Sequence, residues 1–243
     1  MSEQYDYERR LNELDQGIDI TFKKILEPFI YDNISEYLQK KDKNVDIMDI
    51  GCGCGYLSNS ISKRFKSTKV KGIDISESAI KCAKSHFHLN FNKKDIIQLE
   101  EDKKYDVIVY NMVLHNLREL EKAISKTSLI LKDNGVVLIT IPHPAFWLTD
   151  KITRGKITLE NTFNYNTEQF YQIPFKIKNG IFHKTELTYY HRRLSTYLNI
   201  FSEFLSLAKL EEVDFKNGLP TMLRIVLENK NCNIKSLKKT NKL

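Results

Sequence analysis

Residues 45–55 read Val45-Asp-Ile-Met-Asp-Ile-Gly-Cys-Gly-Cys-Gly55, an apolar stretch that runs into three alternating glycines. The first six residues have the composition of a buried strand, and a segment of helical composition, 56–65, follows the glycines. A glycine turn between a strand and a helix lets a ligand approach the backbone closely, because no Cβ atom intervenes. The stretch therefore predicts the first βα unit of a ligand-binding α/β domain.

The same alternation continues along the chain. Further strands are predicted over 69–74, 88–92, 105–110 and 135–141, with helices over 76–85, capped by Ser76 or Ser78, and 119–131. Two helices within 5–40 precede this core, and a helix over 195–208 and strands over 210–215 and 221–227 follow it. Repeated βα units indicate an α/β fold: a Rossmann-like, mainly parallel sheet of seven strands flanked by helices.

The length of 243 residues predicts one domain over 1–229, followed by a basic flexible tail, 230–243. Its parts are the N-terminal helices 1–44, the core 45–141, an aromatic-rich cap insertion 142–193 and the end of the sheet 194–229. The charged beginning lacks a secretory signal, and the sequence lacks a run of about 20 apolar residues, so we expect a cytoplasmic protein with no membrane contact. The cysteines have no spacing typical of disulfides, and we expect thiols.

The formal charge of +7 is concentrated at the C-terminus. Removing the five lysines of the last segment leaves about +2 on the body, which is too little for a strong phosphate-binding field. Nucleic acid is therefore not an expected partner.

The glycine spacing separates two ligand classes. A dinucleotide fingerprint requires its third glycine at position 56, which is Tyr56 here, whereas the third glycine is Gly55. The run Asp49-Ile-Gly51-Cys-Gly53-Cys-Gly55 instead resembles the first motif of class I S-adenosylmethionine-dependent methyltransferases. A second acid, Asp74, ends the next predicted strand, where a carboxylate can accept both ribose hydroxyls of an adenosyl group.

The resemblance extends in order over residues 45–141, through Lys94-Asp95-Ile96, the strand ending in Asn111, and Leu131-Lys-Asp-Asn-Gly135. It implies that the cofactor is S-adenosyl-L-methionine and the product S-adenosyl-L-homocysteine. It further implies these cofactor-binding residues: Asp49, Gly51, Gly53, Gly55, Asp74, Ile75, Asp95, Ile96 and Asn111.

Each acid also has a purely structural interpretation. Asp49 can brace the loop, Asp74 can be an ordinary strand-end acid, and Asp95 can cap a turn. Cys52 and Cys54 have only one residue between them and no paired Cys or His nearby in the sequence, which makes a poor zinc site. No metal is therefore expected.

In a parallel sheet the ligand crevice lies beyond the carboxyl ends of the strands, so the candidate catalytic residues are those that follow these strand ends. A general base helps when the methyl acceptor is a hydroxyl, and histidine suits that role near neutral pH. His115 and His143 follow the fourth and fifth predicted strands, and His191 ends the cap. The pairing of His143-Pro with His191-Arg resembles a bacterial branch of the family that acts on small molecules, although each histidine can instead bond a loop backbone.

Arg192 and Arg193 can bind a carboxylate or phosphate bidentately or merely solvate the cap, and Trp147 of the cap is a candidate substrate contact. The sequence thus predicts methyl transfer to a small, anionic or neutral acceptor, favouring an oxygen nucleophile in a metabolite, sugar or phosphorylated precursor. The alternatives are a protein or RNA methyltransferase, a cofactor-binding protein without catalysis and, least favoured, a nicotinamide oxidoreductase. The high Lys, Asn and Ile content suggests a bacterial origin.

Overall fold

The computed structural model describes residues 7–41, 44–100, 102–153, 163–176, 182–213 and 218–230. Its main sheet has seven strands in the order β3-β2-β1-β4-β5-β9-β8. The strands are β1 (Val45–Ile50), β2 (Thr68–Asp74), β3 (Asn90–Lys93), β4 (Tyr105–Asn111), β5 (Leu131–Pro142), β8 (Leu205–Val213) and β9 (Met222–Asn229). The first five are mutually parallel, and β9 is antiparallel to both β5 and β8. The predicted Rossmann-like fold is confirmed.

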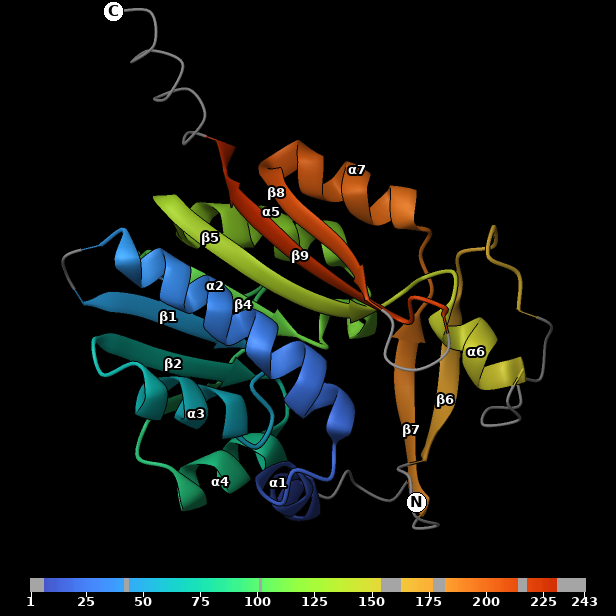
Figure 1. Ribbon diagram of the computed structural model, residues 1–243, viewed down its shortest axis with the longest axis horizontal. Helices are drawn as coiled ribbons and strands as arrows, with labels where there is room; N and C mark the ends of the chain where they lie inside the picture. Colours follow the sequence, from blue (N-terminus) through green and yellow to red (C-terminus); the bar gives the residue numbers. More distant parts are fainter. Residues whose placement is uncertain are drawn as a thin grey trace, which may run out of the picture.

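Helices cover both faces of this sheet (Figure 1). They are α1 (Tyr7–Asp15), the π-helical turn η1 (Phe22–Leu26), α2 (Glu27–Gln39), α3 (Tyr56–Arg64), α4 (Glu77–His86), the 3-10 turn η2 (Leu114–Asn116), α5 (Leu120–Ile130), α6 (Trp147–Thr153) and α7 (Leu194–Phe204). The side chain of Ser76 caps α4 by accepting the backbone N–H of Ala79, as the sequence predicts.

Two apolar cores lie on opposite faces of the sheet. One joins the inward side chains of α5 and α7 to β4, β5 and β9, with Ile108, Ile139 and Phe201 among its members. The other joins α1, α2 and α3 to β1 and β4, with Ile30, Ile47 and Ile61 among its members. Because the central strands are apolar on both faces, each needs this double cover to remove its side chains from water.

The cap insertion has secondary structure of its own. It contains the short helix α6 and a two-stranded antiparallel sheet, β6 (Phe170–Lys176) with β7 (Phe182–Tyr190). Figure 1 shows this hairpin and α6 beyond the end of the main sheet at which β5 finishes. Residues 154–162 and 177–181 of the cap, and the predicted tail beyond Lys230, lie outside the described residues.

Strand boundaries shift by a few residues from the sequence prediction. β5 begins at Leu131 rather than at 135, and β8 occupies 205–213 rather than 210–215, which shortens α7 to end at Phe204. In the described part of the chain, no helix is both long enough and apolar enough to span a bilayer.

Candidate functional site

The glycine loop leaves the carboxyl end of β1 and is pinned to β2. Backbone N–H groups of Gly51 and Cys52 both donate to the Ile73 carbonyl, at 2.8 and 3.0 Å. Gly51 has a φ of 71°, and a Cβ atom there would lie 2.4 Å from Cγ2 of Val113. Gly53 also has a positive φ, 54°, but a Cβ there would meet only a Tyr7 ring carbon, at 3.9 Å. Gly51 is thus required for packing, while the backbone at Gly53 stays accessible to a ligand.

Asp74 lies at the end of β2, directly beside this loop. Its Oδ2 accepts the backbone N–H of Gly53 at 2.9 Å, and its Oδ1 accepts that of Ser76 at 2.8 Å. Each carboxylate oxygen keeps a second lone pair, so the pair can still accept hydroxyl protons. Burial raises the pKa of Asp74 above its ordinary value, against the lowering effect of these backbone bonds.

Asp49 lies in β1, two residues before Gly51, and is buried. Its side chain is 1% exposed, and its Oδ2 accepts the hydroxyl of Ser58 on α3 at 2.6 Å. Burial raises its pKa to about 6, and the nearby Asp74 charge adds to that rise. The bond to Ser58 shows Asp49 bracing β1 against α3, which is the structural interpretation considered above.

The remaining residues predicted to bind the cofactor differ in their exposure and in the hydrogen bonds they make. Ile75, beside Asp74, is 66% exposed, so its apolar surface is open to a ligand. Asp95 Oδ1 accepts the backbone N–H of Ile97 at 2.9 Å, and Asn111 Oδ1 accepts the Thr140 hydroxyl at 2.7 Å. Ile96 belongs to the buried core at 3% exposure, so the expected contact with a ligand ring is not supported by its position.

The cap brings two of the three candidate histidines together around Tyr189. The ring centroid of Tyr189 lies 5.8 Å from that of His115 on η2 and 6.3 Å from that of His191 at the end of β7. Trp147, at the start of α6, stacks on the same tyrosine at 5.5 Å. With Arg192, these four residues, His115, Trp147, Tyr189 and His191, are called the Tyr189 cluster below.

Three polar atoms of the Tyr189 cluster are buried without a hydrogen-bond partner among the described residues: Nδ1 of His115, Nδ1 of His191 and Nη1 of Arg192. The Nε2 of His191 lies 2.9 Å from the Tyr165 carbonyl, which can only accept, so its Nδ1 carries a lone pair. The other terminal nitrogen of Arg192 donates to the carbonyls of Leu117 and Arg118. Buried polar atoms without a partner are costly, and they mark a place where a ligand or water belongs.

Both imidazoles of the cluster are held neutral at ordinary pH. Burial, together with a smaller effect of the Arg192 charge, lowers the pKa of His115 to about 3. Burial also lowers the pKa of His191, partly opposed by its bond to the Tyr165 carbonyl. A neutral imidazole nitrogen that carries an unpaired lone pair, as Nδ1 of His191 does, accepts a hydrogen bond from a hydroxyl or amine.

His143 is placed differently from the expectation that it contacts the acceptor. Its Nδ1 accepts the backbone N–H of Ala145 at 3.1 Å, and its Nε2 lies 2.7 Å from Oε1 of Glu212 on β8. Because Nδ1 accepts, Nε2 carries the proton and donates it to the carboxylate. Neither nitrogen is left to take a proton from a substrate, so this geometry does not support the catalytic prediction.

Arg193 also differs from its expectation. Its Nε pairs with Glu168 at 3.4 Å, and nearly half of its side chain is exposed. Arg192, by contrast, turns inward to the Tyr189 cluster. Sequence reasoning therefore could not separate these adjacent arginines, because only the direction of the chain at the end of β7 decides which of them faces the interior.

Sequence reasoning missed two residues beside the loop. Met112 follows β4 with a φ of 60°, a left-handed conformation that non-glycine residues seldom adopt and that occurs often at functional sites. Tyr7 of α1 reaches over the loop to hydrogen-bond the Ser76 side chain. No local pattern announces either residue, although the helical period of 5–40 does predict the element that carries Tyr7.

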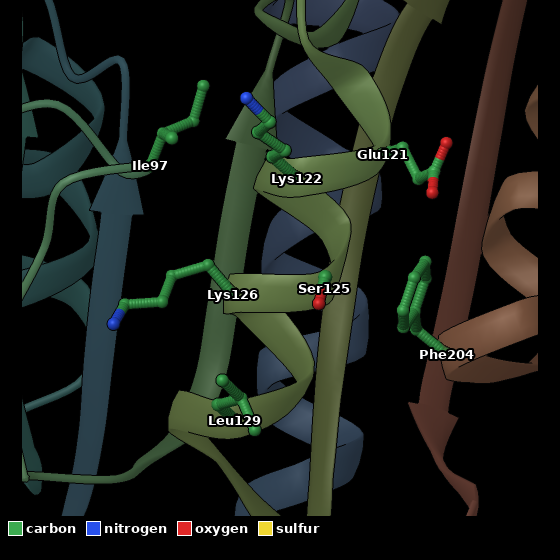
Figure 2. Close-up of a pocket in the computed structure, with 7 residues that line it drawn as sticks. All are labelled: Ile97, Glu121, Lys122, Ser125, Lys126, Leu129 and Phe204. Carbon is green, nitrogen blue, oxygen red and sulfur yellow. The ribbon is translucent and has the colours of Figure 1, made fainter.

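The hollow in Figure 2 lies away from both groups of residues. It is lined by side chains of α5, including Lys122 and Leu129, together with Ile97 and Phe204 of α7. It contains none of the predicted site residues, so we attach no function to it.

Comparison with known proteins agrees with the fold. The family described as "Methyltransferase domain" matches residues 41–194. The chain is 34% identical over 111 residues to ribosomal protein L11 methyltransferase of Dictyoglomus turgidum, covering 43% of this chain and 36% of that protein. It is 30% identical over 166 residues to malonyl-[acyl-carrier protein] O-methyltransferase of Acetivibrio thermocellus, covering 58% of this chain and 59% of that protein.

These matches span between about a third and three fifths of the relatives' lengths. Among solved structures, an S-adenosylmethionine-dependent methyltransferase from Clostridium acetobutylicum superposes with a TM-score of 0.61 at 17% identity. The superposition covers 89% of this chain and 98% of that one. At such low identity the likeness concerns the fold.

Proposed function

This chain belongs to the class I S-adenosylmethionine-dependent methyltransferase family, and we propose that it methylates a small acceptor bound at the Tyr189 cluster. The observation that carries the proposal is the set of three buried polar atoms without partners on His115, His191 and Arg192. They lie at the carboxyl end of the sheet, where ligands of α/β folds bind.

The residues around the glycine loop fit the cofactor of the family. S-adenosylmethionine carries positive charge and two ribose hydroxyls, and the loop offers two carboxylates, the buried Asp49 and the half-buried Asp74, whose pKa values are raised. A bound cation relieves that unfavourable placement of negative charge. The open backbone at Gly53 and the exposed side chain of Ile75 supply close approach and an apolar surface. We assign cofactor binding to Asp74, Gly53 and Ile75, a packing role to Gly51 and Gly55, and a bracing role to Asp49.

When bound beside the glycine loop and Asp74, the cofactor would supply an electrophilic methyl group and would leave as S-adenosylhomocysteine. The chain's own residues orient the acceptor for this in-line displacement. Nδ1 of His115 or His191 accepts the proton of a hydroxyl or amine and so directs a lone pair of that group, and Arg192 Nη1 binds an anionic substituent.

A hydroxyl acceptor fits these groups best. With its pKa near 3, His115 holds a proton poorly on its own. An anionic acceptor paired with Arg192 offsets the arginine charge, which is the smaller of the two causes that lower the pKa of His115. Burial, the larger cause, remains, so His115 orients the hydroxyl as a neutral imidazole while Arg192 binds the anionic group. This combination favours small hydroxy acids or phosphorylated alcohols. The O-methyltransferase named among the relatives supports an oxygen nucleophile.

The matched pair Arg192→Ala and Arg193→Ala tests the proposal. Label transfer from S-adenosylmethionine is measured with a panel of hydroxy acids and phosphorylated alcohols. For any acceptor that is methylated, Arg192→Ala should raise KM at least about tenfold, while Arg193→Ala, exposed and paired with Glu168, should change it less than about twofold. Equal effects of the two substitutions, or label found only on protein, would reject this placement of the acceptor.

A protein acceptor is the second candidate, because one relative is named for methylation of a ribosomal protein. The enclosed position of the three polar atoms argues for a smaller ligand or a single protruding side chain. Incubation with labelled cofactor and ribosomal proteins distinguishes the two: label on a protein, with none on the small-molecule panel, would favour the second candidate.

A further inference from the structure

A cluster of metal-ligating side chains lies where α1 meets α4, apart from the Tyr189 cluster. It consists of Glu8 from α1 and Cys82 and His86 from α4, and one ligand atom of each lies within 4.8 Å of the other two. Oε2 of Glu8 is 3.3 Å from Nε2 of His86. Figure 1 shows α1 beside α4 at the edge of the fold. We propose that these three side chains bind a zinc ion, with water as the fourth ligand.

The spacing of the donor atoms suits zinc. Bonds of about 2.0–2.3 Å in a tetrahedral arrangement place neighbouring donor atoms roughly 3.3–3.8 Å apart. The Glu8–His86 distance already matches this spacing, and the 4.8 Å limit leaves the sulfur only a small movement to make. Cys82 and His86 are four residues apart on one helix, so they project from the same face.

The histidine is prepared for coordination through Nε2. Its Nδ1 lies 3.0 Å from the backbone carbonyl of Cys82, which can only accept, so Nδ1 carries the proton and donates. Nε2, the other ring nitrogen, faces Oε2 of Glu8, so a metal ion would bind between them in place of a proton. A metal-bound histidine commonly donates its other ring N–H to a carbonyl in this way, which fixes both tautomer and ring orientation.

The chemistry of the set favours zinc over a hard cation. A sulfur and an imidazole nitrogen are ligands that magnesium and calcium do not prefer, whereas zinc binds both together with a carboxylate. The Cys82 residue is only 5% exposed, while the side chains of His86 and Glu8 are 40% and 60% exposed, so an ion can enter from solvent. The neighbouring cations of α1 are directed elsewhere: Arg9 pairs with Glu13, and Arg10 with Asp19.

The site would connect α1 to the glycine loop. Tyr7, next to Glu8, hydrogen-bonds Ser76 and lies over the open side of Gly53. An ion held by Glu8 and α4 would therefore fix the position of Tyr7 beside this part of the loop. This consequence rests on the proposed cofactor site, whereas metal binding itself does not.

The test uses the full chain, treated with a chelator and dialysed, and titrated with Co²⁺ as a spectroscopic substitute for Zn²⁺. We expect one equivalent to bind with a thiolate-to-cobalt charge-transfer band, and Zn²⁺ to displace it. Cys82→Ser should abolish the band, and His86→Ala and Glu8→Gln should each weaken Zn²⁺ binding at least about tenfold. His88→Ala, an exposed histidine just past α4, is the matched control and should leave affinity unchanged.

Absence of binding, or equal affinity in wild type and His86→Ala, would reduce the cluster to a surface ion pair and overturn the proposal. Because His86 and Glu8 are largely exposed, their substitution should leave the chain folded even if Cys82→Ser does not. S-adenosylhomocysteine affinity is measured with and without Zn²⁺. A gain of at least about threefold with zinc supports the link through Tyr7, and an unchanged affinity rejects that link. Failure of the nucleoside to bind at all would reject the proposed cofactor site without affecting the metal result.

Discussion

Nε2 of His143 donates to Oε1 of Glu212 at 2.7 Å while its Nδ1 accepts the N–H of Ala145, so a loop that follows β5 is tied to β8 through one imidazole. The ring is 2% exposed, and its loss would leave Ala145 N–H without this acceptor. We therefore expect His143→Ala to cost about 1–3 kcal/mol of unfolding free energy. Denaturant unfolding measures this cost, and kcat of the folded fraction should be nearly unchanged.

The opposite result is informative. If His143→Ala keeps full stability and loses turnover, then His143 is the base that the sequence suggested, and Glu212 orients it. His115→Ala is the comparison, because its Nδ1 has no partner among the described residues. It should lower turnover with little loss of stability.

Asp74→Asn should weaken S-adenosylhomocysteine binding at least about tenfold, because an amide replaces one of the two carboxylate oxygens available to the ribose hydroxyls. Calorimetry measures the affinity. Glu77→Gln, three residues later, is a suitable control because Glu77 is exposed and pairs with Lys81 and Lys93. An unaltered affinity in Asp74→Asn, or an equal loss in the control, would contradict the assignment of Asp74.

Asp49 makes stability depend on pH in a defined direction. Its folded pKa of about 6 exceeds the ordinary 3.8, so the folded state binds more protons than the unfolded state between those values. The contribution of this group is complete below about pH 4 and is lost as pH rises through about 6, by the order of 2–3 kcal/mol. Asp49→Asn should remove that decline.

Urea unfolding of wild type and Asp49→Asn between about pH 4 and pH 8 measures the difference. Subtracting the two profiles removes the effect of Asp74, which is present in both. Parallel profiles would show that Asp49 keeps its ordinary pKa. Cofactor binding should become tighter as pH rises through the same range in wild type, because the ionised carboxylate attracts a cationic ligand.

Gly51→Ala should destabilise the chain more than Gly218→Ala does. Both glycines have positive φ, 71° and 73°, which costs an alanine about 1–2 kcal/mol. Only at Gly51 would the added methyl group clash, because its Cβ would lie 2.4 Å from a Val113 side-chain carbon. A Cβ at Gly218 would have no described atom within 4 Å. Thermal unfolding compares the two, and the double variant Gly51→Ala/Val113→Ala should recover part of the difference. Equal losses would show that the backbone conformation alone matters.

The sequence by itself determined the fold and the place of the glycine loop. Val45–Ile50, the glycine run and Asp74 depend on local rules: an apolar run forms a buried strand, a glycine permits positive φ, and a strand-end acid lies at the crevice. The Ser76 cap is equally local. Such features can be predicted from the sequence because their physical causes act within a few residues of one chain segment.

Only the tertiary structure decided which side chains meet. Glu212 reaches His143 because β9 lies between β5 and β8, and Glu8 reaches His86 because α1 packs on α4. The two adjacent arginines of the cap separate into one inward and one outward residue for the same reason. The protonated nitrogen of a histidine, and hence its chemistry, is set by partners distant in sequence, and periodicity carries no information about them.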